Sequence, residues 1–138
     1  MNKTILVVDD CDMMRRFLVP VFKHDFRVIS LNNPFDAILW LKTNPAPDMI
    51  LLDYELPGMS GFEMLNHLRK SKAWANIPTI ILSGVKDAEK RWQCLEAGAN
   101  DFISKPFHPK ELSLRVHLLM NRINAQKLTT PLNRSFMI

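Results

Sequence analysis

The sequence predicts an α/β fold, a doubly wound domain in which five parallel strands alternate with five helices. Short apolar runs rich in β-branched residues are separated by longer segments in which apolar residues return every three or four positions. The strand-like runs, MILL and TIIL among them, are apolar throughout or nearly so, as strands covered on both faces of a sheet require. Alternation of the two element types implies parallel strands joined by right-handed crossovers.

The elements follow from these patterns in chain order. Strands are expected at residues 4–8, 26–31, 49–52, 77–82 and 101–104. Helices are expected at residues 13–23, 34–42, 61–70, 87–97 and 109–123. Each strand therefore precedes one helix, which gives the order (βα)5.

Residues that favour helix ends stand near the predicted boundaries. Asp12 is placed to cap the first helix, and Asn33 precedes Pro34 at the start of the second. Gly98 follows the fourth helix, at the position where a glycine commonly ends a helix. Pro20 lies inside the first helical segment and lacks a backbone donor, so we expect a kink or an early end near it.

Length and composition indicate one globular domain. The chain has 138 residues, of which 47% are hydrophobic, so it can bury a substantial core. We expect that domain to span residues 1–124, with residues 125–138 as a polar tail or the start of a linker. No apolar run approaches the ~18 residues of a membrane span, and no secretory signal precedes the first strand, so we expect a cytoplasmic protein without membrane contact.

Charge and cysteine usage exclude some kinds of site. Residues 105–138 hold six Lys and Arg residues against one Glu, a bias that favours a solvated helix face over a nucleic-acid site. Cys11 and Cys94 lie far apart without the spacing of a redox motif or a zinc site. We interpret both cysteines as reduced and structural.

Polar residues end four of the five predicted strands. Asp9 and Asp10 follow the first, Asp53 the third, Ser83 the fourth and Lys105 the fifth. Ligands of open parallel sheets bind beyond these strand ends. With the flavodoxin-like strand order 2-1-3-4-5, the first and third strands are neighbours at the topological switch. We therefore expect the five side chains to share one crevice.

The chemistry of such a crevice points to phosphoryl transfer. Carboxylate oxygens without a closed protein cage suit Mg²⁺, which retains waters and leaves a position for a phosphate oxygen. Asp53 can act as a nucleophile toward phosphorus, and Ser83 and Lys105 can neutralise charge on the transferring group. Any one of these residues alone is more often a turn or cap residue; the set together favours the functional interpretation.

The same segments resemble the receiver domain of two-component response regulators, over residues 3 to about 123. ILVVDD is similar to the first strand and acidic pair of that family, and MILLDYELPGMSGFEML to the strand, phosphoacceptor and loop that follow. IPTIILSG resembles the segment with the family's hydroxyl position, and GANDFISKPF the fifth strand with its lysine and proline. The resemblance implies a signalling switch of bacterial two-component systems rather than an enzyme, one that catalyses only its own phosphotransfer and slow autodephosphorylation.

The resemblance also implies roles for particular residues. Asp53 would accept a phosphoryl group from the phosphohistidine of a sensor histidine kinase or a phosphotransfer protein. Asp9, Asp10, Asp53 and the backbone carbonyl of Glu55 would bind Mg²⁺, for which Mn²⁺ can substitute. Ser83 would bind the phosphoryl oxygens together with Lys105.

Further implications concern the switch that follows phosphorylation. Lys105–Pro106 would be a cis peptide. Phe102 would move inward as Ser83 approaches the phosphoryl group, although it lacks the hydroxyl of the tyrosine that is commoner at this position. Glu55 stands at a variable position that influences phosphate lifetime in this family.

Output is predicted less sharply. In one subfamily of DNA-binding regulators, active receivers form homodimers through the fourth helix, fifth strand and fifth helix. Arg91 with Glu111, and Asp101 with Arg115, resemble the charged pairs of that face; alternatively they are exposed charges of amphipathic helices. An output domain linked covalently in a longer chain is a further expectation, and we expect no direct nucleic-acid binding by this domain itself.

Two other functions compete with this interpretation. Asp10 and Asp12 after a hydrophobic strand also fit the nucleophile and acid/base of haloacid-dehalogenase-like phosphatases, but no later acidic pair completes that set. A pseudo-receiver that serves only as an interaction module is the second alternative. It would normally lack Asp53, Lys105 or the acidic pair, all of which are present.

Overall fold

The computed structural model describes the backbone of residues 3–84 and 86–136, and side chains as far as residue 127. The chain divides into two compact units, Met1–Phe107 and His108–Ile138. The first unit holds the entire sheet and four helices, and the second holds one long helix. The candidate site lies wholly within the first unit.

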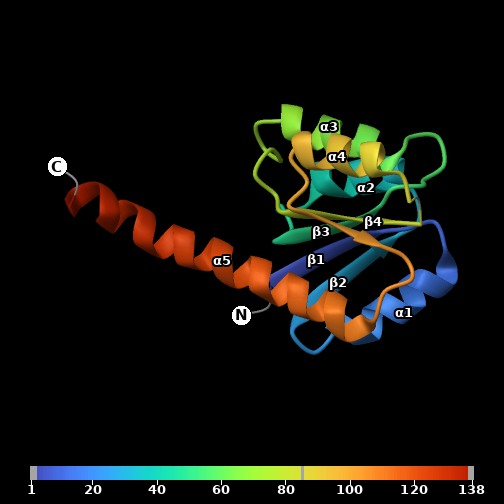
Figure 1. The fold of residues 1–138 in the computed structure, drawn as a ribbon, viewed down its shortest axis with the longest axis horizontal. Coiled ribbons are helices and arrows are strands. Elements are labelled where there is room, and N and C mark those ends of the chain that lie inside the picture. The colour runs from blue at the N-terminus through green and yellow to red at the C-terminus, as the bar shows by residue number, and fades with distance from the viewer. Residues whose placement is uncertain (1–2, 85, 137–138) are drawn as a thin grey trace. The chain divides into compact units, whose positions relative to one another are not determined.

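Five parallel strands form the sheet, in the order β2-β1-β3-β4-β5 (Figure 1). This confirms the predicted fold class and strand order. Each strand lies within two residues of its predicted position, because continuous apolar runs bounded by polar residues mark strands well. The strands are β1 (Lys3–Val8), β2 (Phe26–Leu31), β3 (Met49–Asp53), β4 (Thr79–Ser83) and β5 (Asp101–Ser104).

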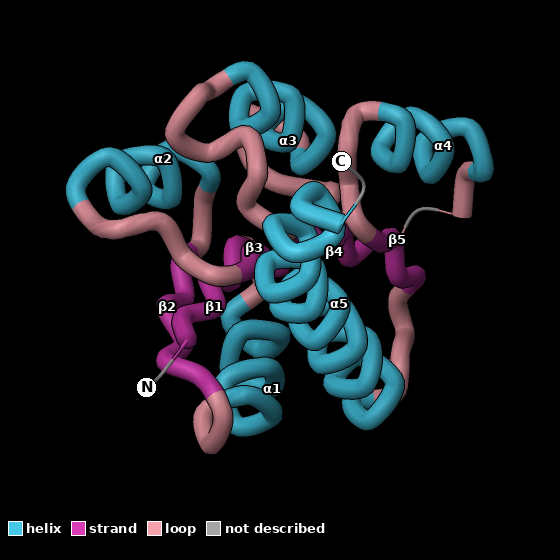
Figure 2. The backbone as a smooth tube through the Cα atoms, turned by 90° about the vertical axis from the view of Figure 1, so that its left-hand side faces the viewer, coloured by secondary structure: helices cyan, strands magenta, loops and turns pink. Residues whose placement is uncertain are grey.

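Helices cover both faces of this sheet. Figure 2 shows α1 on one face and α2, α3 and α4 on the opposite face, which is the arrangement that the apolar strands require. Every residue of β3 and β4 is buried. The bounds of these helices are α1 (Asp12–Phe22), α2 (Pro34–Thr43), α3 (Gly61–Lys70) and α4 (Ala88–Glu96).

The hydrophobic core fixes the central strands against the helices α2, α3 and α4. Leu6 and Val8 of β1 and Leu52 of β3 are fully buried, and they belong to one cluster with Met64 and Leu68 of α3. Burying one such side chain stabilises the fold by roughly 1.5–3 kcal/mol. The strand ends that carry the polar residues are therefore held by the buried core.

Helix ends agree with the sequence except at the first helix. Asn33 caps α2 by accepting a hydrogen bond from the Asp36 N–H at 2.8 Å, and Gly98 follows α4 with a φ of +106°. The prediction that Asp12 caps α1 is wrong: Cys11 is the N-cap residue, and it makes no side-chain cap. The Cys11 N–H donates to the Asp9 carboxylate at 2.9 Å, so a side chain at the end of β1 holds the turn that leads into the helix.

Asp12 is the first residue of α1, and its carboxylate pairs with Arg15 and Arg16, each at 3.0 Å. Acidic side chains in the first turn of a helix are favoured by its macrodipole. The helix continues through Pro20 and ends at Phe22, close to its predicted end at residue 23, so the kink or early end expected near Pro20 stays a prediction.

The second unit is a single helix, α5 (Pro109–Phe136). It starts where predicted but continues beyond residue 123 through most of the expected polar tail. Residues 124–130 contain neither glycine nor proline, so nothing local ends the helix there. The division between a domain at 1–124 and a tail at 125–138 stays a prediction. No helix among the described residues is both long and apolar enough to cross a membrane.

Candidate functional site

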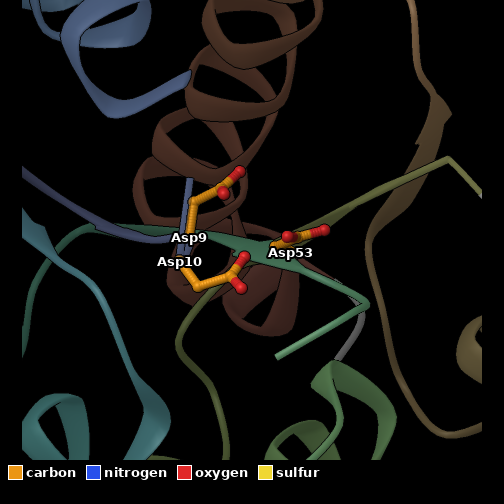
Figure 3. Close-up of side chains that lie close together, drawn as sticks. All are labelled: Asp9, Asp10 and Asp53. Carbon is orange, nitrogen blue, oxygen red and sulfur yellow. The ribbon is translucent and has the colours of Figure 1, made fainter. Parts of the chain in front are cut away.

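Three carboxylates meet at the carboxyl edge of the sheet. Asp9 directly follows β1, and Asp53 is the last residue of β3, the neighbouring strand in which Leu52 pairs with Val8. Asp10 comes next in the chain after Asp9. One carboxylate oxygen from each lies within 4.8 Å of the others, and Figure 3 shows the three side chains gathered together. The strand order alone brings them to this point.

The three carboxylates differ in exposure. Asp9 is 1% exposed and Asp53 is 5% exposed, whereas Asp10 lies open to solvent. Like charges this close disfavour one another's ionised form, and burial adds to that effect. The pKa of Asp53 is accordingly raised to about 6, chiefly by burial and secondly by the charge of Asp9.

Lys105 supplies the cation that opposes this crowding. Its Nζ lies 3.2 Å from Asp9 Oδ2 and 3.2 Å from Asp53 Oδ1, and the side chain is only 21% exposed. Burial by itself lowers the pKa of Lys105, but the carboxylates of Asp53 and Asp9 more than offset this, and the pKa is raised. Lys105 is therefore charged at neutral pH and bridges the two buried carboxylates.

The fourth and fifth strands complete the edge as the sequence predicts. Ser83 ends β4 and is fully buried, and its carbonyl accepts a hydrogen bond from the Lys105 N–H at 2.7 Å. The Lys105–Pro106 peptide bond is cis. Phe102 lies on β5 with 3% of its surface exposed. Asp53 and Lys105 thus stand on either side of the strand that carries Ser83.

The loop after β3 approaches the site very closely. The Glu55 N–H donates to Asp53 Oδ1 at 3.4 Å, which helps to orient that carboxylate. A Cβ atom on Gly61 would lie 2.3 Å from the Asp53 carbonyl oxygen, so only glycine allows α3 to begin here. Glu55 itself is exposed, and its predicted role through the backbone carbonyl stays a prediction.

Two features of the site were not predicted from the sequence. Arg15 donates a hydrogen bond from Nη1 to the Asp9 carbonyl at 2.7 Å. Its spacing of three residues from Asp12 predicts an ion pair on one helix face, but not the contact with Asp9. The second feature is an apolar cavity of about 410 Å³ beside the acidic pair; it is lined by Cys11, Met13, Met14, Phe17, Pro106 and Phe107.

The residues predicted for a dimer face are not all on one unit. Arg91 and Asp101 belong to the first unit, and Glu111 and Arg115 to the second, where they pair with each other at 3.3 Å within α5. A pairing between copies of the chain stays a prediction. Asp12 lies outside the carboxylate group found among the described residues, and its carboxylate pairs with Arg15 and Arg16.

The donor set fits a hard divalent cation. Three carboxylates offer oxygen ligands, the exposed one provides an entry side, and no sulfur or imidazole ligand belongs to the group found in the described part of the chain. Mg²⁺ prefers such oxygen ligands and usually retains several waters. The residues present therefore fit Mg²⁺ better than Zn²⁺, which favours nitrogen and sulfur.

Curated proteins with similar sequences are components of signalling systems. The chain is 37% identical over 125 residues to the phosphate regulon transcriptional regulatory protein PhoB of Escherichia coli K12, covering 90% of this chain and 54% of that protein. It is 35% identical over 129 residues to the hybrid signal transduction histidine kinase D of Dictyostelium discoideum, covering 91% of this chain and 8% of that protein. The chain thus spans about half the length of the PhoB proteins that it matches, and much less of the kinase.

Solved structures give the same result. The receiver domain of the Francisella response regulator 1452 superposes with a TM-score of 0.80 at 31% identity, covering 88% of this chain and 99% of that one. The BeF3-activated DrrB receiver domain superposes with a TM-score of 0.78 at 28% identity, with the same coverage. The sequence model of the response regulator receiver domain matches residues 5–117, most of the chain. The resemblance seen in the sequence is thereby confirmed, and the chain belongs to the receiver-domain family of response regulators.

Proposed function

We propose that this domain is a phosphorylation-controlled switch in which Asp53 accepts a phosphoryl group with the help of Mg²⁺. The observation that carries the proposal is the convergence of three carboxylates and one ammonium group at the carboxyl edge of the sheet. Asp9, Asp10, Asp53 and the Glu55 carbonyl would hold the metal, and Mn²⁺ can take its place. When bound, the ion neutralises charge on the phosphoryl oxygens and orients them toward the attacking carboxylate.

Asp53 has the properties of the acceptor. With a pKa of about 6 it is mostly ionised at neutral pH, and its buried position keeps competing water away. A carboxylate oxygen attacks phosphorus, the new P–O bond forms, and the bond from phosphorus to the donor's imidazole nitrogen breaks. The imidazole leaves with the electron pair of that bond and is then protonated. Lys105, already within hydrogen-bond distance of Asp53, neutralises the charge added to the acceptor.

The switch would begin at Ser83 and Phe102. The new phosphoryl group places negative charge beside the end of β4, where the Ser83 hydroxyl can donate to a phosphoryl oxygen. A shift of Ser83 changes the packing around Phe102 on the adjacent strand β5. A local charge event would in this way bias two arrangements of the β4–β5 side of the domain.

Partners follow from the same chemistry. The phosphoryl donor would be a phosphohistidine on a sensor histidine kinase or a phosphotransfer protein, and the exposed Met13 and Phe17 beside the site offer it an apolar rim. PhoB is by its name a transcriptional regulator, which supports control of a covalently linked output domain or of a separate partner. A homodimer through α4, β5 and α5 and a location in the bacterial cytoplasm complete the proposal.

Labelling with a small phosphodonor tests this function. The protein is incubated with Mg²⁺ and acetyl phosphate, and the added phosphoryl group is located by mass spectrometry under conditions that preserve the labile acyl phosphate. We expect one group on Asp53, none in Asp53→Asn, and normal labelling in Asp48→Asn, whose carboxylate bonds to Thr4 at the opposite edge of the sheet.

The alternatives give different outcomes. Label on Asp10, or steady turnover of phosphate esters, would support the haloacid-dehalogenase-like phosphatase and contradict the proposal. Absence of any label with Mg²⁺ present would identify a pseudo-receiver that acts only through interactions. In Asp10→Ala, Mg²⁺ binding should weaken strongly, because the solvent-facing carboxylate of the cluster is lost.

A further inference from the structure

Arg15 contacts the turn that carries the metal-binding pair. Its Nη1 donates to the Asp9 carbonyl at 2.7 Å and its Nη2 donates to Asp12 Oδ1 at 3.0 Å. The side chain is 16% exposed, whereas the adjacent Arg16, which pairs with the same Asp12, is 80% exposed. Arg15 is thus the arginine that is folded inward against the turn.

We propose that Arg15 is a positioning residue that fixes the direction of Asp9 and Asp10 before a cation binds, an inference that rests on the proposed Mg²⁺ site. The Asp9 carbonyl belongs to the peptide unit that joins Asp9 to Asp10. Because that unit is planar, holding its oxygen also sets its N–H and the Cα of Asp10. The guanidinium therefore determines where the exposed carboxylate begins, without touching it.

The N–H and the carboxylate of Asp9 are already hydrogen-bonded, and the Arg15 contact adds a partner for its carbonyl. The Asp9 N–H donates to the Leu31 carbonyl at 3.1 Å. Its carboxylate accepts from the Cys11 N–H at 2.9 Å and from Lys105 at 3.2 Å. The carbonyl is the group of Asp9 that accepts from a side chain of α1, so Arg15 is the side chain through which the helix holds this turn.

An anchor is needed because the pair is under repulsion. Three carboxylates within 4.8 Å favour any movement that separates them, and exposed Asp10 is the one with room to move. A turn held in the binding geometry loses less conformational freedom when the cation arrives. Arg15 would therefore strengthen cation binding although it is itself a cation.

Positioning and simple electrostatics predict opposite changes in Mg²⁺ affinity when Arg15 is replaced. Removing a positive charge beside an acidic site also removes its repulsion of Mg²⁺, so electrostatics alone would strengthen Mg²⁺ binding. Loss of the anchor should weaken it instead, by about tenfold for one charge-assisted hydrogen bond. Arg15→Lys preserves the charge but cannot contact Asp9 and Asp12 in the same planar fork, so its Mg²⁺ affinity should fall nearly as far as that of Arg15→Met.

The test measures the Mg²⁺ dissociation constant by titration followed in amide NMR spectra. Arg15→Met and Arg15→Lys are compared with Arg16→Met, a matched control that removes a neighbouring arginine bound to the same Asp12 without contact to Asp9. We expect about tenfold weaker binding in both Arg15 variants and wild-type affinity in the control. The initial rate of labelling by acetyl phosphate should recover toward that of the wild type at saturating Mg²⁺, which a generally damaged domain would not show.

The outcomes distinguish this inference from the proposed function. If the wild-type protein binds no Mg²⁺, the metal site itself is wrong. If the wild type binds Mg²⁺ and is labelled on Asp53, but Arg15→Met binds as tightly or more tightly, only the positioning role is overturned. Should Arg15→Met fail to fold, Arg15→Lys decides: wild-type affinity in that variant contradicts positioning by the planar fork.

Discussion

Replacing Asp53 by asparagine should make the metal-free domain more stable, and more so at neutral than at acidic pH. Asparagine has nearly the same shape but cannot ionise. The native carboxylate carries two penalties in the folded state, its burial and the charge of Asp9, which together outweigh the contact with Lys105. A variant without the charge avoids both penalties.

The magnitude follows from the pKa. A folded-state pKa of about 6 against an ordinary value of 3.8 means that ionising Asp53 costs the folded state about 3 kcal/mol at pH 7. Because the raised pKa belongs to the folded protein, the folded state holds more protons than the unfolded state between pH 3.8 and about 6. Stability of the wild type relative to Asp53→Asn is therefore lost as the pH rises through this window, and the two proteins should be similarly stable below it.

Urea denaturation followed by circular dichroism, in the presence of a chelator, measures this difference. The free energy of unfolding is determined from pH 4 to pH 8 for the wild type, for Asp53→Asn and for Asp48→Asn, whose carboxylate lies at the other edge of the sheet. We expect the curves of the wild type and Asp53→Asn to separate by up to about 3 kcal/mol above pH 6 and to converge near pH 4. Added Mg²⁺ should stabilise the wild type and narrow the gap.

A gap between the two proteins that does not change with pH would refute this reasoning. It would show that Asp53→Asn acts through packing or the unfolded state rather than through ionisation of the carboxylate. Destabilisation of Asp53→Asn at neutral pH would show that the ion pair with Lys105 dominates over burial.

Three further changes test the surroundings of the site. Gly61→Ala should destabilise the domain by about 3 kcal/mol in urea denaturation, because its Cβ would lie 2.3 Å from the Asp53 carbonyl oxygen; an unchanged midpoint would contradict the close approach. Lys105→Met should raise the pKa of Asp53 further in carboxyl ¹³C NMR, since the cation that lowers it is removed, and a lower pKa would count against the pairing. Asn33→Ala should cost about 1 kcal/mol through loss of the α2 cap, whereas Asn33→Ser, which preserves a capping acceptor without adding a charge beside Asp36, should not.

The fold and the convergence of the acidic groups could be predicted because they depend on strong local patterns. Unbroken apolar runs mark buried strands, and a parallel sheet brings the ends of its strands to one edge. Once β1 and β3 are neighbours, Asp9 and Asp53 must lie together, whatever the details of the loops. The helix cap at Asn33 is similarly local, because its side chain reaches only three residues along the chain.

Contacts that depend on competition between nearby groups could not be predicted in this way. Asp12 has the right type for a cap, but the helix begins one residue too early for it, with Cys11 at the N-cap, and the Asp12 carboxylate pairs with Arg15 and Arg16. The inward position of Arg15 depends on the path of the turn, and Arg16 beside it has the same chemistry and faces outward. The end of α5 was missed for another reason, since polar residues without a glycine are compatible with either a helix or a linker.

The structure assigns different tasks to carboxylates that look equivalent in the sequence. Asp9 is buried and fully tied, Asp53 is buried but reaches the edge with a raised pKa, and Asp10 faces solvent. The proposed cation would enter beside Asp10, because this is the carboxylate of the three that faces solvent. Without a cation, the repulsion among the three carboxylates destabilises the folded state, and Lys105 offsets only part of it. Any cation or charge redistribution that relieves this repulsion would stabilise the site, and the proposed binding of Mg²⁺ and transfer of a phosphoryl group to Asp53 would both draw on that relief.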